Sequence, residues 1–211
     1  MKNTLYPKLI SVLLAAWFVF ALTASAFNLF NTGPEAPPIA LGLAAGGPVI
    51  AFLVWFLVSP SLRQFALSLN PRTLTFLQSW RIAGYTFLVL YFTGLLPGIF
   101  ALPAGWGDVA IGITAPFAAM YLATAQRRGS FVAWQLLGIA DLVTAVTLGA
   151  TARLIDPHGI QNSLMAVLPL SLIPTFAVPL CLIFHIICIA QAATSAETLR
   201  WSETTAPARE A

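Results

Sequence analysis

The sequence predicts an all-α integral membrane protein, a bundle of six transmembrane helices. Hydrophobic residues make up 59% of the 211 positions and charged residues only 8%, whereas a soluble domain carries about 25% charged residues. Six apolar runs approach the roughly 20 residues that a helix needs to cross the hydrocarbon core. The remaining charges gather mainly on one side of these runs. Together these observations exclude an ordinary water-soluble domain.

Turn-forming sequences containing Gly, Pro, Asn or Asp separate the predicted spans. The spans cover residues 9–30, 38–59, 76–97, 108–126, 131–152 and 166–193. They form a single domain, residues 1–196, which we expect to be followed by a short, disordered polar tail in the cytoplasm, residues 197–211. No polar segment is long enough to fold as a separate soluble domain, so any functional site lies in or at the membrane.

The basic residues predict the orientation, because Lys and Arg concentrate in cytoplasmic loops. With the N-terminus in the cytoplasm, only Arg153 falls outside. The cytoplasmic set is Lys2, Lys8, Arg63, Arg72, Arg127, Arg128, Arg200 and Arg209. We therefore expect an N-in, C-in protein. The same placement explains the net charge of +3 without a nucleic-acid partner.

The first span admits two interpretations. Met1-Lys2, an apolar run and Thr23-Ala24-Ser25-Ala26 resemble a secretory signal with its cleavage site. The apolar region of such signals extends over about 7–15 residues. Here the uncharged stretch continues from Leu9 to Phe30, which is long enough to span a membrane and favours an uncleaved helix.

Two connections are unlike ordinary loops. Residues 61–69 place Leu62, Phe65 and Leu69 on one helical face, which predicts a short interfacial helix on the cytoplasmic surface. Residues 97–107 contain no charge. We expect this segment to lie in the outer headgroup region with Trp106 as an anchor, or to re-enter the membrane.

Two short stretches of the sequence resemble known proteins. They are Pro103-Ala-Gly-Trp-Gly-Asp108 and Ile173-Pro-Thr-Phe-Ala-Val-Pro-Leu-Cys-Leu-Ile-Phe-His185. Over these two stretches the chain resembles small, uncharacterised multi-pass membrane proteins of bacteria. The resemblance implies a bacterial inner-membrane location and supplies no activity.

Three ionisable residues inside the predicted spans are functional candidates, because charge is costly in the bilayer. Arg81 lies one turn inside the third span, Asp141 near the middle of the fifth, and His185 in the cytoplasmic half of the sixth. In one interpretation they form a proton relay or contact a substrate. In the other they form a structural clasp, or Arg81 extends to the interface and leaves a protonated Asp141 bonded to a neighbour.

Helical spacing adds further members to this polar network. Gln78 and Tyr85 share a face with Arg81, and Thr144 shares a face with Asp141. We expect these side chains to line the same seam between helices.

Asp108 begins the fourth predicted span. It is either the N-cap of that helix or, with Asp156, His158 and Arg153, part of an outer vestibule for a cation or substrate. Nothing in the spacing decides whether these residues meet.

The sixth span contains Pro174 and Pro179, which leave the carbonyls of Leu170 and Thr175 without their helical hydrogen bonds. Such carbonyls need a neighbouring helix, water or a cavity. A cavity or hinge and a static kink both explain the pattern. In the second span, Gly42 and Gly46 form a GxxxG pair that predicts close helix packing inside the bundle.

We expect no metal and no cofactor. Cys181, His185 and Cys188 come from one helix without a complementary cluster elsewhere, and His158 lies near the opposite face. No nucleophile–base motif or phosphate loop points to an enzyme. The leading hypothesis is a small permease, channel or proton-coupled carrier. The alternatives are an accessory protein that packs against a membrane partner or a second copy, and a membrane-embedded redox or metal-binding subunit.

Overall fold

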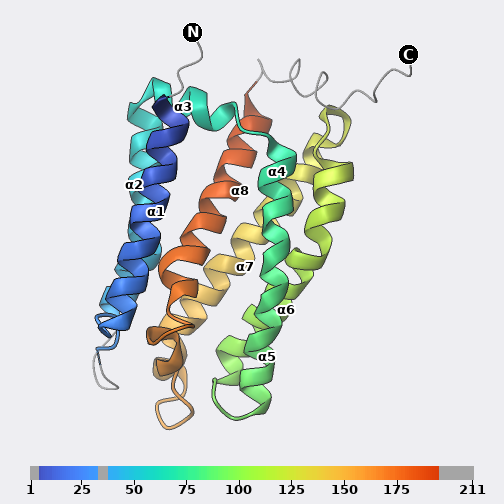
Figure 1. Cartoon of the computed structure of the whole chain (residues 1–211). Helices are drawn as coiled ribbons and strands as arrows, with labels where there is room; N and C mark the ends of the chain where they lie inside the picture. Colours follow the sequence, from blue (N-terminus) through green and yellow to red (C-terminus); the bar gives the residue numbers. More distant parts are fainter. Residues whose placement is uncertain (1–4, 33–37, 195–211) are drawn as a thin grey trace.

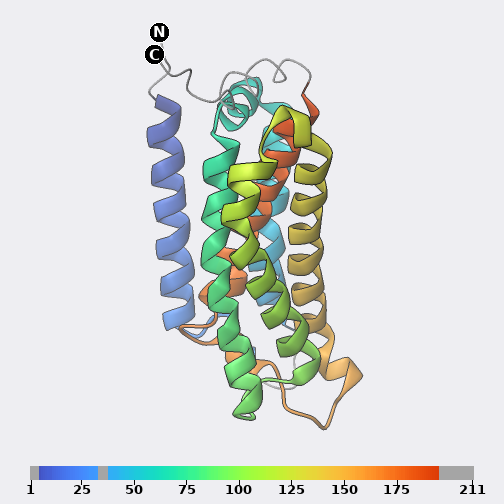
Figure 2. The ribbon, with the colours of Figure 1, turned by 90° about the vertical axis from the view of Figure 1, so that its right-hand side faces the viewer.

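The structure is a computed structural model that describes residues 5–32 and 38–194. Every regular element in this part of the chain is helical, and it contains no β-strand. The long helices run side by side, and the short α3 (Pro60–Leu67) lies across one end of the bundle (Figures 1 and 2). We call this the α3 end. The opposite end, which carries the connection 156–172, is the loop end (Figure 1).

Within residues 5–32 and 38–194, five helices are long and apolar enough to cross a membrane, which confirms the all-α class and the presence of apolar spans. They cover Tyr6–Ala26, Ile39–Val58, Gly98–Leu122, Ala125–Ile155 and Ile173–Ala193. The elements concerned are α1 (Leu5–Ala26), α2 (Ile39–Val58), α6 (Gly98–Phe117) with η2 (Ala118–Leu122), η3 (Ala125–Arg127) with α7 (Arg128–Ile155), and η5 (Ile173–Ala177) with α8 (Val178–Ala193). Large apolar side chains cover their outward faces, as expected for a protein surrounded by lipid.

The third predicted span is built from three consecutive helical segments. These are α4 (Pro71–Phe76), the 3₁₀ helix η1 (Leu77–Gly84) and α5 (Tyr85–Phe92). The helix begins at Pro71 because the Asn70 side chain accepts a hydrogen bond from the Arg72 amide at 2.8 Å, and proline suits the first helical position. The boundaries predicted at 76 and 97 therefore lie about five residues too late.

Residues 97–107 do not form a connection before the next helix, because α6 begins at Gly98 and continues through this segment. Pro103 removes only the hydrogen bond to the carbonyl of Ile99, and the helix passes over it. Asp108 consequently lies in the middle of α6 and is not the N-cap of a helix.

The predicted short helix at 61–69 is present as α3. The Ser59 side chain accepts from the Leu62 amide at 3.3 Å, and Leu62 and Ala66 are buried against the bundle. Gln191 of α8 donates to the carbonyls of Leu69 at 2.7 Å and Ala66 at 3.1 Å. These bonds satisfy one carbonyl in the last turn of α3 and one in the loop that follows it, and they hold α3 over the end of α8.

The last span is shorter than the predicted 166–193. Residues Ser163–Ala166 form a separate short 3₁₀ helix, η4, and the continuous helix begins at Ile173 with a π-helical turn. Pro179 leaves the Thr175 carbonyl without its helical donor. The indole of Trp17 in α1 donates to this carbonyl at 3.1 Å. The freed carbonyl is therefore satisfied by a neighbouring helix.

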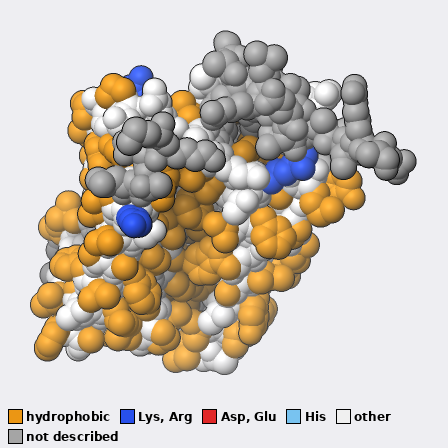
Figure 3. Space-filling view, turned by 45° about the horizontal axis from the view of Figure 1, so that its top comes forward, with side chains coloured by type: hydrophobic (Ala, Val, Ile, Leu, Met, Phe, Trp, Pro, Cys, Tyr) orange, Lys and Arg blue, Asp and Glu red, His pale blue; other side chains and the backbone are white. Residues whose placement is uncertain are grey.

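Basic side chains gather at the α3 end. Arg63 belongs to α3, Arg72 to the start of α4, and Arg127 immediately precedes α7. Figure 3 shows Lys and Arg side chains close to this end, while hydrophobic side chains cover the flanks. The loops of the two ends therefore differ in charge.

The GxxxG pair of α2 does not pack closely against another helix. A Cβ atom added at Gly42 or Gly46 would meet nothing within 4 Å. The expectation of close internal packing at this pair is wrong.

Candidate functional site

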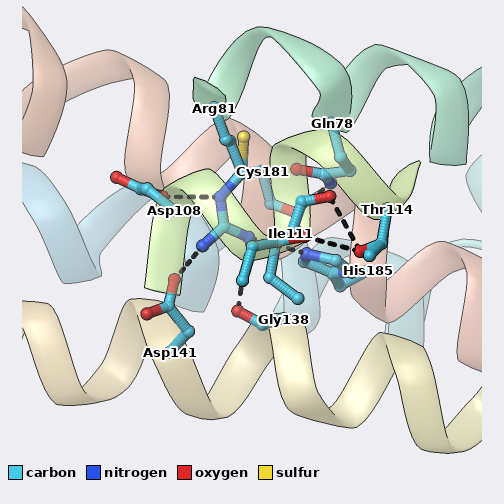
Figure 4. A network of polar contacts seen from close by, with 10 residues as sticks. Gln78, Arg81, Asp108, Ile111, Thr114, Gly138, Asp141, Cys181 and His185 are labelled. Atoms are coloured by element: carbon cyan, nitrogen blue, oxygen red, sulfur yellow. Dashed lines mark hydrogen bonds and ion pairs between the residues drawn. The ribbon is translucent and has the colours of Figure 1, made fainter. Parts of the chain in front are cut away.

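Arg81 is the centre of a buried polar cluster in the middle of the bundle. Its guanidinium lies between two carboxylates from different helices (Figure 4). Nε donates to Oδ1 of Asp108 at 2.7 Å, and Nη2 donates to Oδ2 of Asp141. Arg81 is only 3% exposed. It does not extend to the interface, and because the helix begins at Pro71 it lies about 17 Å along the helix from that end.

Small residues bring these helices close enough for the ion pairs. A Cβ atom at Gly112 of α6 would lie 2.3 Å from the backbone nitrogen of Ile82. A Cβ atom at Gly84 would lie 2.3 Å from Cβ of Asp108. Only glycine permits this approach of η1 to α6, and it places Asp108 beside Arg81.

The rest of the guanidinium contacts α7 and α8. Nη1 lies 3.5 Å from the carbonyl of Gly138 and 3.3 Å from Nε2 of His185. Because arginine only donates hydrogen bonds, Nε2 of His185 is the acceptor. The remaining ring nitrogen, Nδ1, then carries the proton and donates to Oε1 of Gln135.

The hydrogen bonds continue from Gln135 toward the α3 end. Its Nε2 donates to Oγ1 of Thr75 at 3.0 Å. Oγ1 of Thr75 lies 3.9 Å from Sγ of Cys188, and Sγ donates to the carbonyl of Pro71 at 3.9 Å. Gln135, Thr75 and Cys188 are at most 1% exposed. We call His185, Gln135, Thr75 and Cys188 the inner chain.

An apolar cluster surrounds the inner chain at the α3 end. Its buried members are Ala66, Leu74, Ala123, Phe131, Ile187, Cys188 and Ala192. Phe131 is fully buried. This packing separates Arg81 from the surface at the α3 end.

On the other side of Arg81 a cavity of about 170 Å³ extends toward the loop end. Asp108 lines it together with residues of α2, α6, α7, η5 and the loop before η5. Apolar side chains such as Phe87, Phe100 and Val146 form much of its wall. Arg153, Gln161 and Asn162 also line it. We call it the outer cavity.

A second, smaller cavity of about 50 Å³ lies beside Arg81 itself. Asp108, Phe87 and Leu142 line both cavities, and Cys181 lines the smaller one. The Arg81–Asp108 ion pair therefore lies where the two cavities adjoin.

Residues 38–193 match the family described as "Domain of unknown function (DUF8737)". The chain belongs to this family. No curated protein and no solved structure matches it.

The DUF8737 region contains every residue of the Arg81 cluster, the inner chain and most of the outer cavity wall. It begins just before α2 and leaves out α1. The candidate site is thus a feature of the family region, to which α1 adds the Trp17 contact.

The structure brings together some of the predicted site residues. Arg81, Asp141 and His185 meet in one cluster, and Gln78 is buried nearby, donating to the carbonyl of Cys181 at 3.2 Å. Tyr85 is 58% exposed, and Thr144 also faces outward. In the 3₁₀ helix η1, residues three apart share a face, so Gln78 and Arg81 align and Tyr85 turns away.

The predicted outer vestibule is assembled differently. Asp108 and Arg153 line the outer cavity, whereas Asp156 and His158 are exposed on the loop after α7 and do not line it. Pro174 also lines the cavity, while Thr175 and Pro179 are buried beside it. The two cysteines are buried free thiols, and no group of three metal-ligating side chains occurs among the described residues.

Sequence reasoning missed two members of the site, Gln135 and Thr75. It named Asp108 as a vestibule residue but did not place it beside Arg81, because it put the start of the helix at 108 instead of Gly98. Gln135 and Thr75 link His185 to the α3 end. Gln135 precedes Gly138 by three residues in an apolar helix, and this shared face was a usable signal.

Proposed function

We propose that this protein is a small proton-coupled carrier in a bacterial inner membrane. The single observation that carries the proposal is the composition of the buried cluster: two carboxylates share one guanidinium at the inner end of a cavity. Both carboxylates ionised would leave an excess negative charge inside the bundle. Such a charge is costly, so one proton or one cation completes the cluster.

The carboxylates are the proton-exchanging groups in this proposal. His185 is a positioning residue, because its Nε2 accepts a hydrogen bond from Arg81. Protonation of Nε2 would place two N–H donors against each other and break this bond. The outer cavity supplies a route from the loop end to Asp108, while the apolar cluster around Phe131 closes the route to the α3 end. This is the arrangement expected of an alternating-access carrier open on one side.

The proposed topology has six spans with both termini in the cytoplasm. Its support is the segment Pro71–Phe92 as a sixth membrane helix and the basic residues of the α3 end. Reporter fusions after residues 65 and 129 should then read cytoplasmic, and a fusion after residue 158 should read external. An exported signal from the fusion at 129 would refute this orientation.

Proteoliposomes that enclose a pH-sensitive dye test the carrier function. Amines, carboxylates and sugars are added outside, and proton movement across the membrane is followed. We expect one class of solute to drive proton movement, with loss of the response in Asp141→Asn and retention in Asp156→Asn, an exposed control. Absence of solute-driven proton movement across the three classes would refute the carrier function.

A second candidate is an accessory membrane protein that binds a partner helix or a second copy of itself. The supporting observation is α2, where Gly46 has open space in place of a packed neighbour. The two proposed functions predict opposite effects of the same two substitutions. The accessory role predicts that Gly46→Leu abolishes cellular function and Asp141→Asn preserves it, whereas the carrier predicts the reverse.

A further inference from the structure

We propose that the outer cavity binds an amphipathic organic cation, an ammonium group on an apolar body, and that its ammonium replaces a proton on Asp108. This inference rests on the proposed function and specifies its substrate class. Two observations support it: the hydrogen-bonding groups of the cluster that have no partner, and the largely apolar side chains of the cavity wall.

Arg81 offers little to an anionic ligand. Nε, Nη1 and Nη2 donate to Asp108, Asp141, Gly138 and His185, which engages four of the five N–H groups of a guanidinium. The guanidinium is almost completely buried. An incoming carboxylate or phosphate would have to displace an aspartate that is already paired.

Asp108, in contrast, can accept a hydrogen bond from a ligand. Arg81 occupies Oδ1, whereas Oδ2 accepts no hydrogen bond from the described residues. The carboxylate lines the outer cavity, and its side chain is 15% exposed. A ligand ammonium there supplies the positive charge that the cluster otherwise takes from a proton.

A second acceptor lies in the cavity wall. Oδ1 of Asn162 is buried without a hydrogen-bond partner, although its Nδ2 donates to the Gly149 carbonyl at 3.4 Å. These two acceptors have no donor among the described residues, so they favour a ligand that donates a hydrogen bond. Apolar groups of Phe87, Phe100 and Val146 provide the surface for an apolar body.

Among the described residues of the wall the one basic side chain is Arg153, which lies far from Asp108. It follows Asp141 by twelve residues in α7, or about 18 Å along the helix. The two charges thus occupy opposite ends of the cavity, and the cation is held at the carboxylate end.

Binding of 2-phenylethylamine to the purified full chain in detergent tests the inference. Calorimetry in two buffers that differ in ionisation heat measures both the affinity and the protons released. The controls are 2-phenylethanol, which lacks the charge, and 3-phenylpropanoate, which reverses it. We expect the amine alone to bind, with release of about one proton to the buffer for each amine bound.

Two pairs of variants locate the site. Asp108→Asn should weaken amine binding about tenfold or more, while Asp156→Asn leaves it unchanged. Gly42→Leu should weaken binding because Gly42 lines the cavity, while Gly46→Leu, which does not line it, should have no effect. Neither glycine has a neighbour within 4 Å of an added Cβ, so both variants should fold.

Failure of binding and failure of transport are distinguishable. Amine binding with proton release but no proton movement in proteoliposomes would refute the carrier and leave the cation site intact. Proton movement driven by another solute, without amine binding, would refute the cation site alone. Equal binding of the alcohol, tighter binding of the carboxylate, or equal losses in Asp108→Asn and Asp156→Asn would also overturn the inference.

Discussion

The two halves of the bundle on either side of Arg81 are built differently. Toward the loop end, Asp108 borders a cavity of about 170 Å³ with largely apolar walls. Toward the α3 end, the inner chain is hydrogen-bonded from His185 to Thr75 and enclosed by buried side chains such as Phe131. The same buried guanidinium is thus paired on one side with a carboxylate that lines a cavity, and on the other side it contacts tightly packed groups.

This difference shows how a small bundle can hold a charge and still give access to it. His185 of the inner chain and the carbonyl of Gly138 fix the guanidinium by presenting acceptors to Nη1. The carboxylates occupy the remaining sides, and Asp108 alone of the two lines the outer cavity. Changes on the two sides should therefore have different consequences.

The largest expected effect is loss of the guanidinium. Arg81→Leu leaves two carboxylates together without a cation, and breaking a buried ion pair typically costs about 3–5 kcal/mol of unfolding free energy. Asp141→Leu should cost clearly less, because Arg81 and Asp108 remain as a balanced pair. Unfolding of the detergent-solubilised variants measures both values. Equal losses of unfolding free energy in the two variants would contradict the assignment of one guanidinium to two carboxylates.

The double variant Arg81→Leu/Asp141→Leu sharpens this test. Asp108 then stays buried without a cation, so the second substitution should not restore the stability lost with Arg81. Full recovery would mean that Arg81 and Asp108 do not interact.

A smaller effect compares one glycine from each half. In Gly138→Ala the added Cβ would lie 2.3 Å from Cε1 of His185, whose ring is fully buried and bonded at both nitrogens. We expect a loss of about 1–3 kcal/mol from overpacking. Gly42→Ala meets open space and should gain up to about 1 kcal/mol from helix propensity. Thermal unfolding of the two variants should shift in opposite directions, and a shared direction would argue against the packing difference.

Much of the bundle was predictable, because apolar run length and turn residues report directly on membrane helices. The charges of the spans also identified Arg81, Asp141 and His185. Their partners depended on helix ends, and here the sequence misled. The Pro and Gly residues of 97–107 suggested a break, yet α6 continues across Pro103 at the loss of one hydrogen bond. Asp108 was therefore placed at a helix end instead of beside Arg81.

The outer cavity could not be predicted by any pattern within one helix. Its wall combines Gly42 of α2, Phe100 of α6, Val146 of α7 and Pro174 of η5. The prolines of the last span suggested a cavity, and the predicted outer vestibule included Asp108 and Arg153 of its wall, but neither pattern gave the wall as a whole. The 3₁₀ geometry of η1, which turns Tyr85 outward, likewise has no clear signal in an apolar sequence.

Thiol labelling measures most directly whether the cluster is open on one side only. Two single-cysteine proteins are compared, one retaining Cys188 of the inner chain and one with Ala145→Cys, in the outer cavity wall one turn beyond Asp141. A membrane-impermeant thiol reagent should modify the cysteine at 145 in the folded protein and leave Cys188 unmodified, and both should react after denaturation. Equal modification of the two folded proteins, or faster modification of Cys188, would contradict the one-sided access to Arg81.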